Sequence, residues 1–285
     1  MADGIVIDGK AIASKVKEQL KSRIESLSSE GKNVRLDAIL VGGDQGGLLY
    51  AKNQAKASQV IGMEYHLHEL PSSASEAEVL ECVASLNSDD SVTGVMVHMP
   101  VPKHIDAALV QSAIAVHKDV EGVNPANIGN VVFGRRSLVP CTALAVMELI
   151  ESTGVNLQGA NVVCVGASRI VGKPVAVLLM QAEATVISTN YHTKDRSNLT
   201  RAADIVISAA GVPSLIGADD ISNGTIVIDV GINRVEDGDG KKITVGDVDF
   251  DAVKEKASYI SPVPGGVGPM TVAMLLRNTV QAAES

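Results

Sequence analysis

Two successive series of alternating segments constrain the fold of this chain more than any other feature. In each series, short apolar runs that end at glycine or proline alternate with longer segments in which apolar residues recur at helical spacing. This alternation is typical of βαβ units, in which helices join parallel strands. Only 2% of the residues are aromatic and 46% are apolar, so the core must be aliphatic. Aliphatic strands suit a parallel sheet that helices cover on both faces.

The first series fills the N-terminal part of the chain. Apolar residues at helical spacing predict an amphipathic helix over residues 10–29 that ends near Gly31. The apolar run 36–41, stopped by two glycines, predicts a buried strand. Further strands are expected at 63–70 and 94–99, and further helices at 48–61 and 75–87.

The second series begins after residue 155. It predicts helices between most of its strands and a last helix over residues 269–284. The expected fold class is therefore α/β, with two α/β domains joined near residues 125–150. The strands of the second series are expected at residues 161–165, 184–188, 204–208 and 225–230.

Charge and composition exclude several classes of function. Acidic residues outnumber basic ones by 33 to 24, and a net charge of −9 argues against a nucleic-acid partner. No apolar run approaches the ~20 residues that span a bilayer. The first residues lack the basic start and apolar stretch of a secretory signal. Cys82, Cys141 and Cys164 show no metal or disulfide spacing, so we expect reduced thiols in a cytoplasmic protein.

The segment 261–271, Ser-Pro-Val-Pro-Gly-Gly-Val-Gly-Pro-Met-Thr, holds three prolines and three glycines. Such a segment forms neither a helix nor a central strand. A helical apolar pattern follows it directly. The sequence therefore predicts a rigid turn that leads into a helix N-terminus, where backbone N–H groups can meet an anionic or planar ligand. A tight surface turn is the alternative.

A second glycine turn follows the strand 161–165. The run Gly166-Ala167-Ser168-Arg169-Ile170-Val171-Gly172 leads from that strand into a helix, the arrangement that seats a pyrophosphate on a helix N-terminus. It is not a strict GxGxxG, because Ser168 stands at the second glycine and the third is displaced to Gly172. A plain strand–helix turn is the alternative.

Several short segments, in order along nearly the whole chain, resemble the bifunctional methylenetetrahydrofolate dehydrogenase/methenyltetrahydrofolate cyclohydrolase family. The resemblance implies a folate-binding catalytic domain of residues 1–125 with the C-terminal helix 269–285. It also implies a Rossmann-like, doubly wound NAD(P)-binding domain of residues 140–268, with a cleft between the two. Besides the two glycine turns and Tyr50, the matching segments are Val41-Gly42, Pro100-Val101-Pro102, Lys118-Asp119-Val120, Pro140-Cys141-Thr142 and Asp229-Val230-Gly231-Ile232-Asn233.

The activity that the resemblance implies is oxidation of 5,10-methylenetetrahydrofolate to the 5,10-methenyl form with NAD(P)⁺, and hydrolysis of that product to 10-formyltetrahydrofolate. Members of the family are commonly homodimers, and neither a membrane nor a nucleic acid is an expected partner. Besides the catalytic positions, the residues implied in substrate binding are Tyr50, Val97, Pro100, Pro262, Gly265 and Gly266. Those implied in cofactor binding are Gly166, Ala167, Ser168, Arg169, Ile170, Gly172, Tyr191 and Ile232.

The chain departs from the family's catalytic pattern. The family pairs a helical Tyr with a Lys four residues later, but here Tyr50 is followed by Gln54. Two lysines nearby, Lys52 and Lys56, each stand two residues from Gln54. Two residues correspond to ~200° around a helix, so both side chains should face away from the site.

Two further positions differ. His98 stands at a strand end where the family has Gln, and Glu121 replaces the usual Asp. His98 could act as a general base oriented by Gln54, could position the pterin, or could be a structural histidine. Glu121 would anchor the pterin with a shifted carboxylate, or is a surface carboxylate. His66 and His68 alternate on one strand face without a third ligand, so no metal site is expected.

The two activities need different chemistry. Hydride transfer needs alignment and the exclusion of water, whereas hydrolysis needs proton transfer. An amide cannot replace a lysine in the second step, so we expect Gln54 to spare oxidation and to weaken hydrolysis. A dehydrogenase for a modified one-carbon carrier and a non-catalytic pterin-binding homologue are the alternatives.

The nucleotide preference is expected to be set after the strand 184–188. No acidic residue stands in Thr189–Lys194 to bind two ribose hydroxyls, so the usual marker of NAD is missing. Ala167 and Tyr191 occupy positions where the family often offers Arg or Ser to a 2′-phosphate. Lys194 or Arg196 could supply that charge, or both are solvated loop cations. We expect NADP, which most bacterial members use, with NAD as the alternative.

Overall fold

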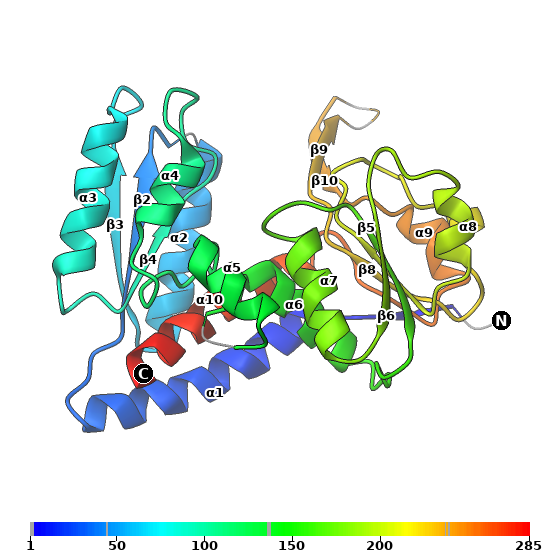
Figure 1. The fold of residues 1–285 in the computed structure, drawn as a ribbon, viewed down its shortest axis with the longest axis horizontal. Coiled ribbons are helices and arrows are strands. Elements are labelled where there is room, and N and C mark those ends of the chain that lie inside the picture. The colour runs from blue at the N-terminus through cyan, green and yellow to red at the C-terminus, as the bar shows by residue number, and fades with distance from the viewer. Residues whose placement is uncertain (1–2, 44, 136–137, 237, 239) are drawn as a thin grey trace. The chain divides into compact units, whose positions relative to one another are not determined.

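The computed structural model describes residues 3–43, 45–135, 138–236, 238 and 240–285. The chain divides into two compact units (Figure 1). Unit 1 comprises Met1–Ala13 and Thr142–Thr271, and unit 2 comprises Ser14–Cys141 and Val272–Ser285. Among the described residues, no helix is both long and apolar enough to cross a membrane.

Unit 2 is built on a three-stranded parallel sheet with the order β3-β2-β4. The central strand β2 (Arg35–Val41) is buried from its second residue onward, as its mainly apolar run predicts. The edge strand β3 (Glu64–Leu70) alternates in exposure, whereas β4 (Gly94–Val97) is wholly buried. The helices of this part of the chain are α1 (Gly9–Ser29), α2 (Gln45–Val60), α3 (Glu76–Ser88), α4 (Ala107–Ala113) and α5 (Pro125–Val132).

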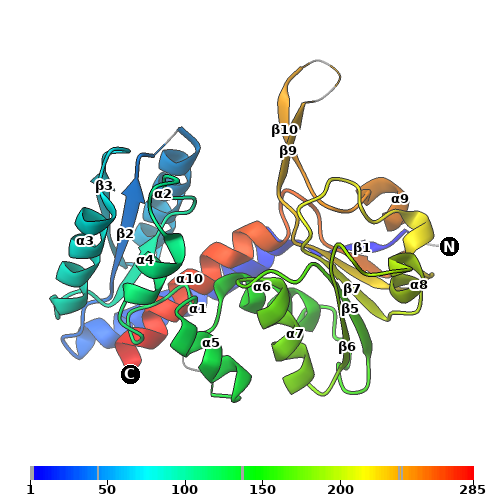
Figure 2. The ribbon, with the colours of Figure 1, turned by 45° about the horizontal axis from the view of Figure 1, so that its top comes forward.

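The core of unit 2 lies between the sheet and the helices α3 and α4, which lie side by side in Figures 1 and 2. Every second residue of β2 faces this layer. Both ends of α3 are capped: Ser75 and Glu78 form a capping box, and the Lys118 ammonium donates to the carbonyl oxygens of Leu86 (3.1 Å) and Asp89 (2.7 Å). The core comprises Ile39, Val41, Ala74, Val79, Val83, Leu86, Val92, Val95, Val97, Ile105, Val110 and Ile114.

The last helix, α10 (Val267–Glu284), contributes its residues from Val272 onward to unit 2. The buried Asn278 amide donates to the carbonyl oxygens of Val120 (2.8 Å) and Val139 (2.9 Å). Arg23 and Glu284 form an ion pair between α1 and α10. A segment distant in sequence therefore completes this unit through side-chain hydrogen bonds.

Unit 1 contains a six-stranded sheet, all of whose strand pairs are parallel, with the order β1-β11-β8-β7-β5-β6. Its central strands are buried, and every strand predicted in the second series is present within one residue at each end. The predicted Rossmann-like sheet is confirmed. The strands are β1 (Ile5–Val6), β5 (Asn161–Val165), β6 (Thr185–Thr189), β7 (Ile205–Ser208), β8 (Ile226–Asp229) and β11 (Tyr259–Ile260).

The helices and one hairpin complete unit 1. The helices are short apart from α6 (Cys141–Glu151) and α7 (Gly172–Gln181). The strands β9 (Asn233–Glu236) and β10 (Lys242–Val245) form an antiparallel hairpin, which extends away from the sheet in Figure 2. The sequence analysis did not predict this hairpin. The short helices are α8 (Arg196–Arg201), α9 (Phe250–Lys254) and the 3-10 turn Ala218–Asp220.

The first residues of the chain correct one expected boundary. The predicted first domain began at residue 1, but in the structure Met1–Ala13 belongs to unit 1. The reason is that β1 pairs in parallel with β11. A two-residue strand is too short for hydrophobic periodicity to show it or to indicate its partner.

Candidate functional site

Helix α2 presents two of the predicted catalytic residues on one face. Tyr50 and Gln54 are one turn apart, so their side chains lie above one another. Gln54 is 1% exposed, whereas Tyr50 keeps 43% of its surface exposed. Lys52 and Lys56 are exposed, as their positions around the helix predict.

His98 follows β4 and packs against Tyr50 of this helix face. Its backbone nitrogen donates to the carbonyl oxygen of Ile39 (2.8 Å), which continues the β2–β4 pairing. Its ring packs edge-on against Tyr50, with centroids 5.9 Å apart and planes at 89°. Only 5% of the residue is exposed, and burial lowers the pKa of the imidazole. His98 is therefore neutral at neutral pH.

Tyr65 on β3 is a member of this cluster that the sequence analysis missed. Its hydroxyl lies 3.4 Å from Gln54 Oε1 and 3.5 Å from His98 Nε2. Tyr65 belongs to none of the segments that carry the family resemblance. The feature of the sequence that could have indicated Tyr65 is a large amphipathic side chain in a strand whose residues alternate in exposure.

The Tyr50 hydroxyl is enclosed although the ring is partly exposed. Burial raises the pKa of Tyr50 to about 12, and the nearby Glu121 and Cys141 act in the same direction. A hydrogen bond from Gln54 acts against this rise. Tyr50 is therefore a neutral phenol that can donate a proton to a hydrogen bond.

Glu121 is held near a second carboxyl group. Burial and, to a lesser extent, the nearby Asp119 raise the pKa of Glu121 to about 8, although a backbone hydrogen bond from Val97 acts against them. The Oε2 atom is buried without a hydrogen-bond partner. A buried carboxyl oxygen without a partner is unusual, and a ligand that donates a hydrogen bond could satisfy it.

Two signature residues next to Glu121 have structural contacts. Asp119 is fully buried and accepts hydrogen bonds from Asn124 N and Asn127 Nδ2, both 2.8 Å long. The Cys141 thiol donates to the carbonyl oxygen of Val120 (3.2 Å), and burial raises its pKa well above the usual range. This thiol is therefore not a reactive nucleophile.

Of the predicted substrate-binding residues in unit 2, Val97 has its side chain in the core. It can reach a ligand only through its backbone. Pro100 is exposed. His66 and His68 pair with Glu64 and Asp37, at 3.9 and 2.7 Å. No cluster of three His, Cys, Asp or Glu side chains with metal-binding geometry occurs among the residues described.

In unit 1 the turn 166–172 connects β5 to α7. Gly166 has φ of +108°, and a Cβ atom on Gly172 would lie 2.0 Å from Gly166 O. Glycine is therefore required for the close approach of this turn to the helix start. The turn is fastened by Ser168, whose Oγ accepts from Gly172 N (3.3 Å). The residues Ser168, Arg169 and Ile170 are exposed beyond the carboxyl end of β5, where Rossmann-like sheets bind nucleotides.

The segment after β6 carries the residues considered for nucleotide preference. Tyr191 is 96% exposed and packs edge-on against His192, with ring centroids 5.3 Å apart. Arg196 pairs with Asp220 (3.3 Å), so its charge is partly neutralised within the protein. Lys194 is exposed.

The remaining predicted residues of unit 1 also lie in loops. Ile232, at 70% exposure, follows the end of β8. Pro262 and Gly265 are partly exposed, whereas Gly266 is buried and donates to Pro262 O (2.8 Å). This turn leads directly into α10, as predicted, although the helix begins two residues earlier than expected.

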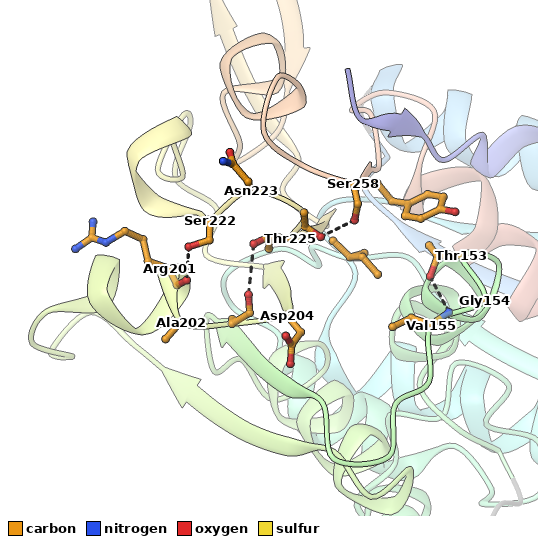
Figure 3. A pocket seen from close by; sticks show the side chains of 14 residues that line it. Thr153, Gly154, Val155, Arg201, Ala202, Asp204, Ser222, Asn223, Thr225 and Ser258 are labelled. Carbon is orange, nitrogen blue, oxygen red and sulfur yellow. Dashed lines mark hydrogen bonds between the residues drawn. The ribbon is translucent and has the colours of Figure 1, made fainter. Parts of the chain in front are cut away.

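A pocket of about 510 Å³ in unit 1 lies at the opposite edge of the sheet (Figure 3). It is lined by residues that precede β7, β8 and β11, among them Asp204, Thr225 and Ser258. Its hydroxyl groups are used within the protein: Ser258 donates to Gly224 O, and Ser222 to Arg201 O, both at 2.7 Å. Ligands of such sheets bind at the carboxyl ends of the strands, so this pocket is not the nucleotide site.

The geometry of both units agrees with the comparisons with known proteins. Residues 7–121 match the tetrahydrofolate dehydrogenase/cyclohydrolase catalytic domain, and residues 140–285 match the NAD(P)-binding domain of the same family. The chain belongs to this family. The predicted family, the enzyme class and the nicotinamide nucleotide cofactor are confirmed.

Relatives and solved structures of the family match almost the whole of this chain. The chain is 46% identical to the bifunctional protein FolD of Moorella thermoacetica, over 98% of both chains. The crystal structure of the bifunctional enzyme FolD from Campylobacter jejuni superposes with a TM-score of 0.94 at 45% identity, covering 98% of each chain. The Trypanosoma brucei FolD structure, a complex with NADP cofactor and inhibitor, has a TM-score of 0.94 at 38% identity and covers 100% of this chain and 98% of that one.

Proposed function

We propose that this family member oxidises 5,10-methylenetetrahydrofolate to 5,10-methenyltetrahydrofolate with NAD(P)⁺, and that its cyclohydrolase activity is weak. The oxidation transfers a hydride from the methylene carbon between N5 and N10 to nicotinamide C4. No proton has to move in that step. The observation that supports the proposal best is a cluster of neutral hydrogen-bonding groups, Gln54, Tyr65 and His98, where the family has a lysine.

Electrostatics favour oxidation at a neutral cluster. The methenyl product carries a positive charge shared between two nitrogens. An ammonium about 4 Å from that charge would repel it by about 4 kcal/mol at an effective dielectric constant of about 20. Gln54 removes this repulsion from the product of hydride transfer.

Hydrolysis needs what this cluster lacks. Water must be deprotonated as it adds to the methenyl carbon, and a ring nitrogen must be protonated as the C–N bond breaks. The hydrogen bonds of Gln54, Tyr65 and His98 described above include no lysine, and the Lys118 ammonium is bound to the end of α3. The proposed weakness of the cyclohydrolase follows from the loss of this proton carrier.

Glu121 and Tyr50 are the proposed substrate contacts in unit 2. The unpartnered Oε2 of Glu121 can accept a hydrogen bond from the amino-pyrimidine edge of the pterin. Tyr50 offers an exposed ring face for contact with the pterin and a neutral hydroxyl for donation. We assign no reacting role to Cys141.

The proposed nucleotide is NADP. Arg196 is paired with Asp220, which leaves Lys194 as the more available cation after β6. Arg169 is a second exposed cation in the turn 166–172. The homodimer remains a prediction from the resemblance, and the cytoplasmic location remains a prediction from the cysteine pattern.

A paired assay tests the proposed function. Dehydrogenase and cyclohydrolase rates are measured on one preparation of the unaltered protein and of the Gln54→Lys variant. We expect oxidation to dominate in the unaltered protein and hydrolysis to rise at least about tenfold in the variant, an effect of about 1.4 kcal/mol on the barrier. A Lys56→Gln variant is the control and should change neither rate, because its side chain is exposed on another face of α2.

Three outcomes would contradict this proposal. If the unaltered protein already hydrolyses methenyltetrahydrofolate as fast as it oxidises the methylene form, His98 has taken over proton transfer. If neither reaction occurs but folate binds tightly, the chain is a binding protein. If the protein oxidises only a modified one-carbon carrier, it is a dehydrogenase for that carrier, an alternative that the changes at Gln54, His98 and Glu121 favour.

A further inference from the structure

We propose that Tyr65 is a positioning residue. Its hydroxyl fixes the direction of a chain of hydrogen bonds that runs from His98 through Tyr65 and Gln54 to Tyr50. The effect of Tyr65 on the reaction rests on the proposed function, whereas the chain of hydrogen bonds itself does not. Three separate elements supply its members: α2, β3 and the end of β4. The structural basis is the position of the Tyr65 hydroxyl, 3.4 Å from Gln54 Oε1 and 3.5 Å from His98 Nε2.

Each member of the chain is uncharged, so the number of protons is fixed. Burial raises the pKa of Tyr65, and the phenol of Tyr50 acts in the same direction. Tyr65 therefore has one hydroxyl proton to donate. Burial lowers the pKa of His98, so its ring carries a single proton on one of its two nitrogens.

The orientation of the Gln54 amide sets the direction of every bond. Tyr65 donates its only proton to Gln54 Oε1, so the Tyr65 oxygen can only accept from His98. The ring proton of His98 must then be on Nε2, and Nδ1 carries the lone pair. The Gln54 NH₂ group, directed away from Tyr65, donates to the Tyr50 oxygen, in agreement with the lowering effect of Gln54 on the pKa of Tyr50.

This direction has two consequences for a ligand at the cluster. The Tyr50 oxygen already accepts a hydrogen bond from Gln54, so its own proton is free to be donated outward. His98 Nε2 cannot accept a proton while it donates to Tyr65, so this nitrogen is not a general base. Tyr65 thus keeps the uncharged Gln54 amide in one orientation, and the Tyr50 hydroxyl can donate a hydrogen bond to a ligand.

The tautomer of His98 tests the inference without any turnover. Long-range ¹H–¹⁵N correlation spectra of the full-length protein, labelled at its six histidines, distinguish a ring protonated at Nε2 from one protonated at Nδ1. The His98 signals are assigned from their loss in a His98→Asn variant. We expect the Nε2–H form in the unaltered protein and a mixture of both forms in Tyr65→Phe. Tyr259→Phe, which removes a hydroxyl in unit 1, is the matched control and should leave the spectrum unchanged.

An Nδ1–H tautomer in the unaltered protein would overturn the inference, whether or not any variant folds. An unchanged Nε2–H spectrum in Tyr65→Phe would overturn it as well. A Gln54→Glu variant gives an independent check, because a carboxylate accepts from both phenols. It should keep the Nε2–H form of His98 while the Tyr50 proton turns inward.

Kinetics test the positioning role separately. In Tyr65→Phe we expect the dehydrogenase kcat to fall about 3- to 10-fold while the KM for the folate stays within about twofold, the effect of one hydrogen bond on the barrier. A fall in kcat without any change in the His98 spectrum would contradict the proposed chain of hydrogen bonds. The expected spectra in a protein that oxidises no methylenetetrahydrofolate would support the chain and refute the proposed function.

Discussion

The carboxylate of Asp229, at the end of β8, accepts a hydrogen bond from the backbone nitrogen of Asp247 (3.0 Å), and the Asp247 carboxylate in turn holds the loop after β7. Asp247 is fully buried. Its Oδ2 accepts from Ala210 N (2.7 Å) and Gly211 N (3.0 Å), and its Oδ1 accepts from Val212 N (3.0 Å). Asp229 therefore holds the segment that carries Asp247, and the Asp247 carboxylate holds the loop after β7.

We expect Asp247→Asn to lower the free energy of unfolding by about 1–3 kcal/mol. An amide has one acceptor oxygen, so its NH₂ group would face backbone donors that then lack a partner. The KM for NAD(P) should rise as the loops lose their positions. Thermal unfolding and cofactor titration measure the two effects. Asp219→Asn, at an exposed site, is the control, and equal behaviour of the two variants would contradict the prediction.

Glu121 should make the stability of the protein depend on pH. Its pKa is raised to about 8, mainly by burial, so the folded state holds this proton more tightly than the unfolded state. Its contribution to stability is therefore full below the usual pKa of a glutamate and is lost as pH rises toward 8. Glu121→Gln should remove this loss.

Melting temperatures of the unaltered protein and of Glu121→Gln, measured between pH 5 and pH 9, check the sign. As pH rises, the melting temperature of the variant should increase relative to that of the unaltered protein. A Glu81→Gln variant, at an exposed position on α3, controls for the general effect of losing a negative charge. Parallel curves for the protein and the Glu121 variant would show that Glu121 is ionised throughout.

Lys194 is expected to determine the preference for NADP. Loss of one charged contact to a 2′-phosphate costs about 1.5–3 kcal/mol, so kcat/KM for NADP should fall at least about tenfold in Lys194→Ala. The value for NAD should change little, because NAD lacks that phosphate. Lys21→Ala, on the exposed side of α1 in unit 2, is the control. A similar loss with both nucleotides would rule out a specificity role.

Gly172 should tolerate no side chain. A methyl group there would lie 2.0 Å from Gly166 O, a backbone atom that cannot move aside cheaply. Gly172→Ala should destabilise the protein by about 1–3 kcal/mol and weaken NAD(P) binding. Gly129→Ala is the matched control, since that position in α5 has open space and alanine favours a helix. Isothermal titration and thermal unfolding compare them.

Local patterns predicted most of the fold because they act over short distances. The mainly apolar run of β2 and the helical spacing of α1 each reveal a burial pattern within one element. The same reasoning oriented Lys52 and Lys56 away from Gln54 correctly. The two-residue strand β1 was missed because its partner β11 is distant in the sequence. The hairpin β9–β10 was missed because its strands are only four residues long and largely exposed, so they show no clear apolar pattern.

The residues of the candidate site that lie in segments resembling the family could be predicted, whereas those outside these segments could not. Tyr65 was missed because only the pairing of β3 and the packing of α2 bring its hydroxyl to Gln54. Lys118 illustrates the opposite case. It belongs to a matching segment, but its ammonium binds the carbonyl groups at the end of α3 rather than a ligand. No rule of sequence spacing distinguishes these two roles.

The terminal segments exchange places between the units: Met1–Ala13 belongs with Thr142–Thr271, and Val272–Ser285 with Ser14–Cys141. Neither half of this enzyme is therefore a continuous stretch of polypeptide. During synthesis, the half formed first must wait for the final residues to leave the ribosome before Asn278 can reach its partners. Gene truncations and fusions that separate the halves at a single cut would leave both incomplete.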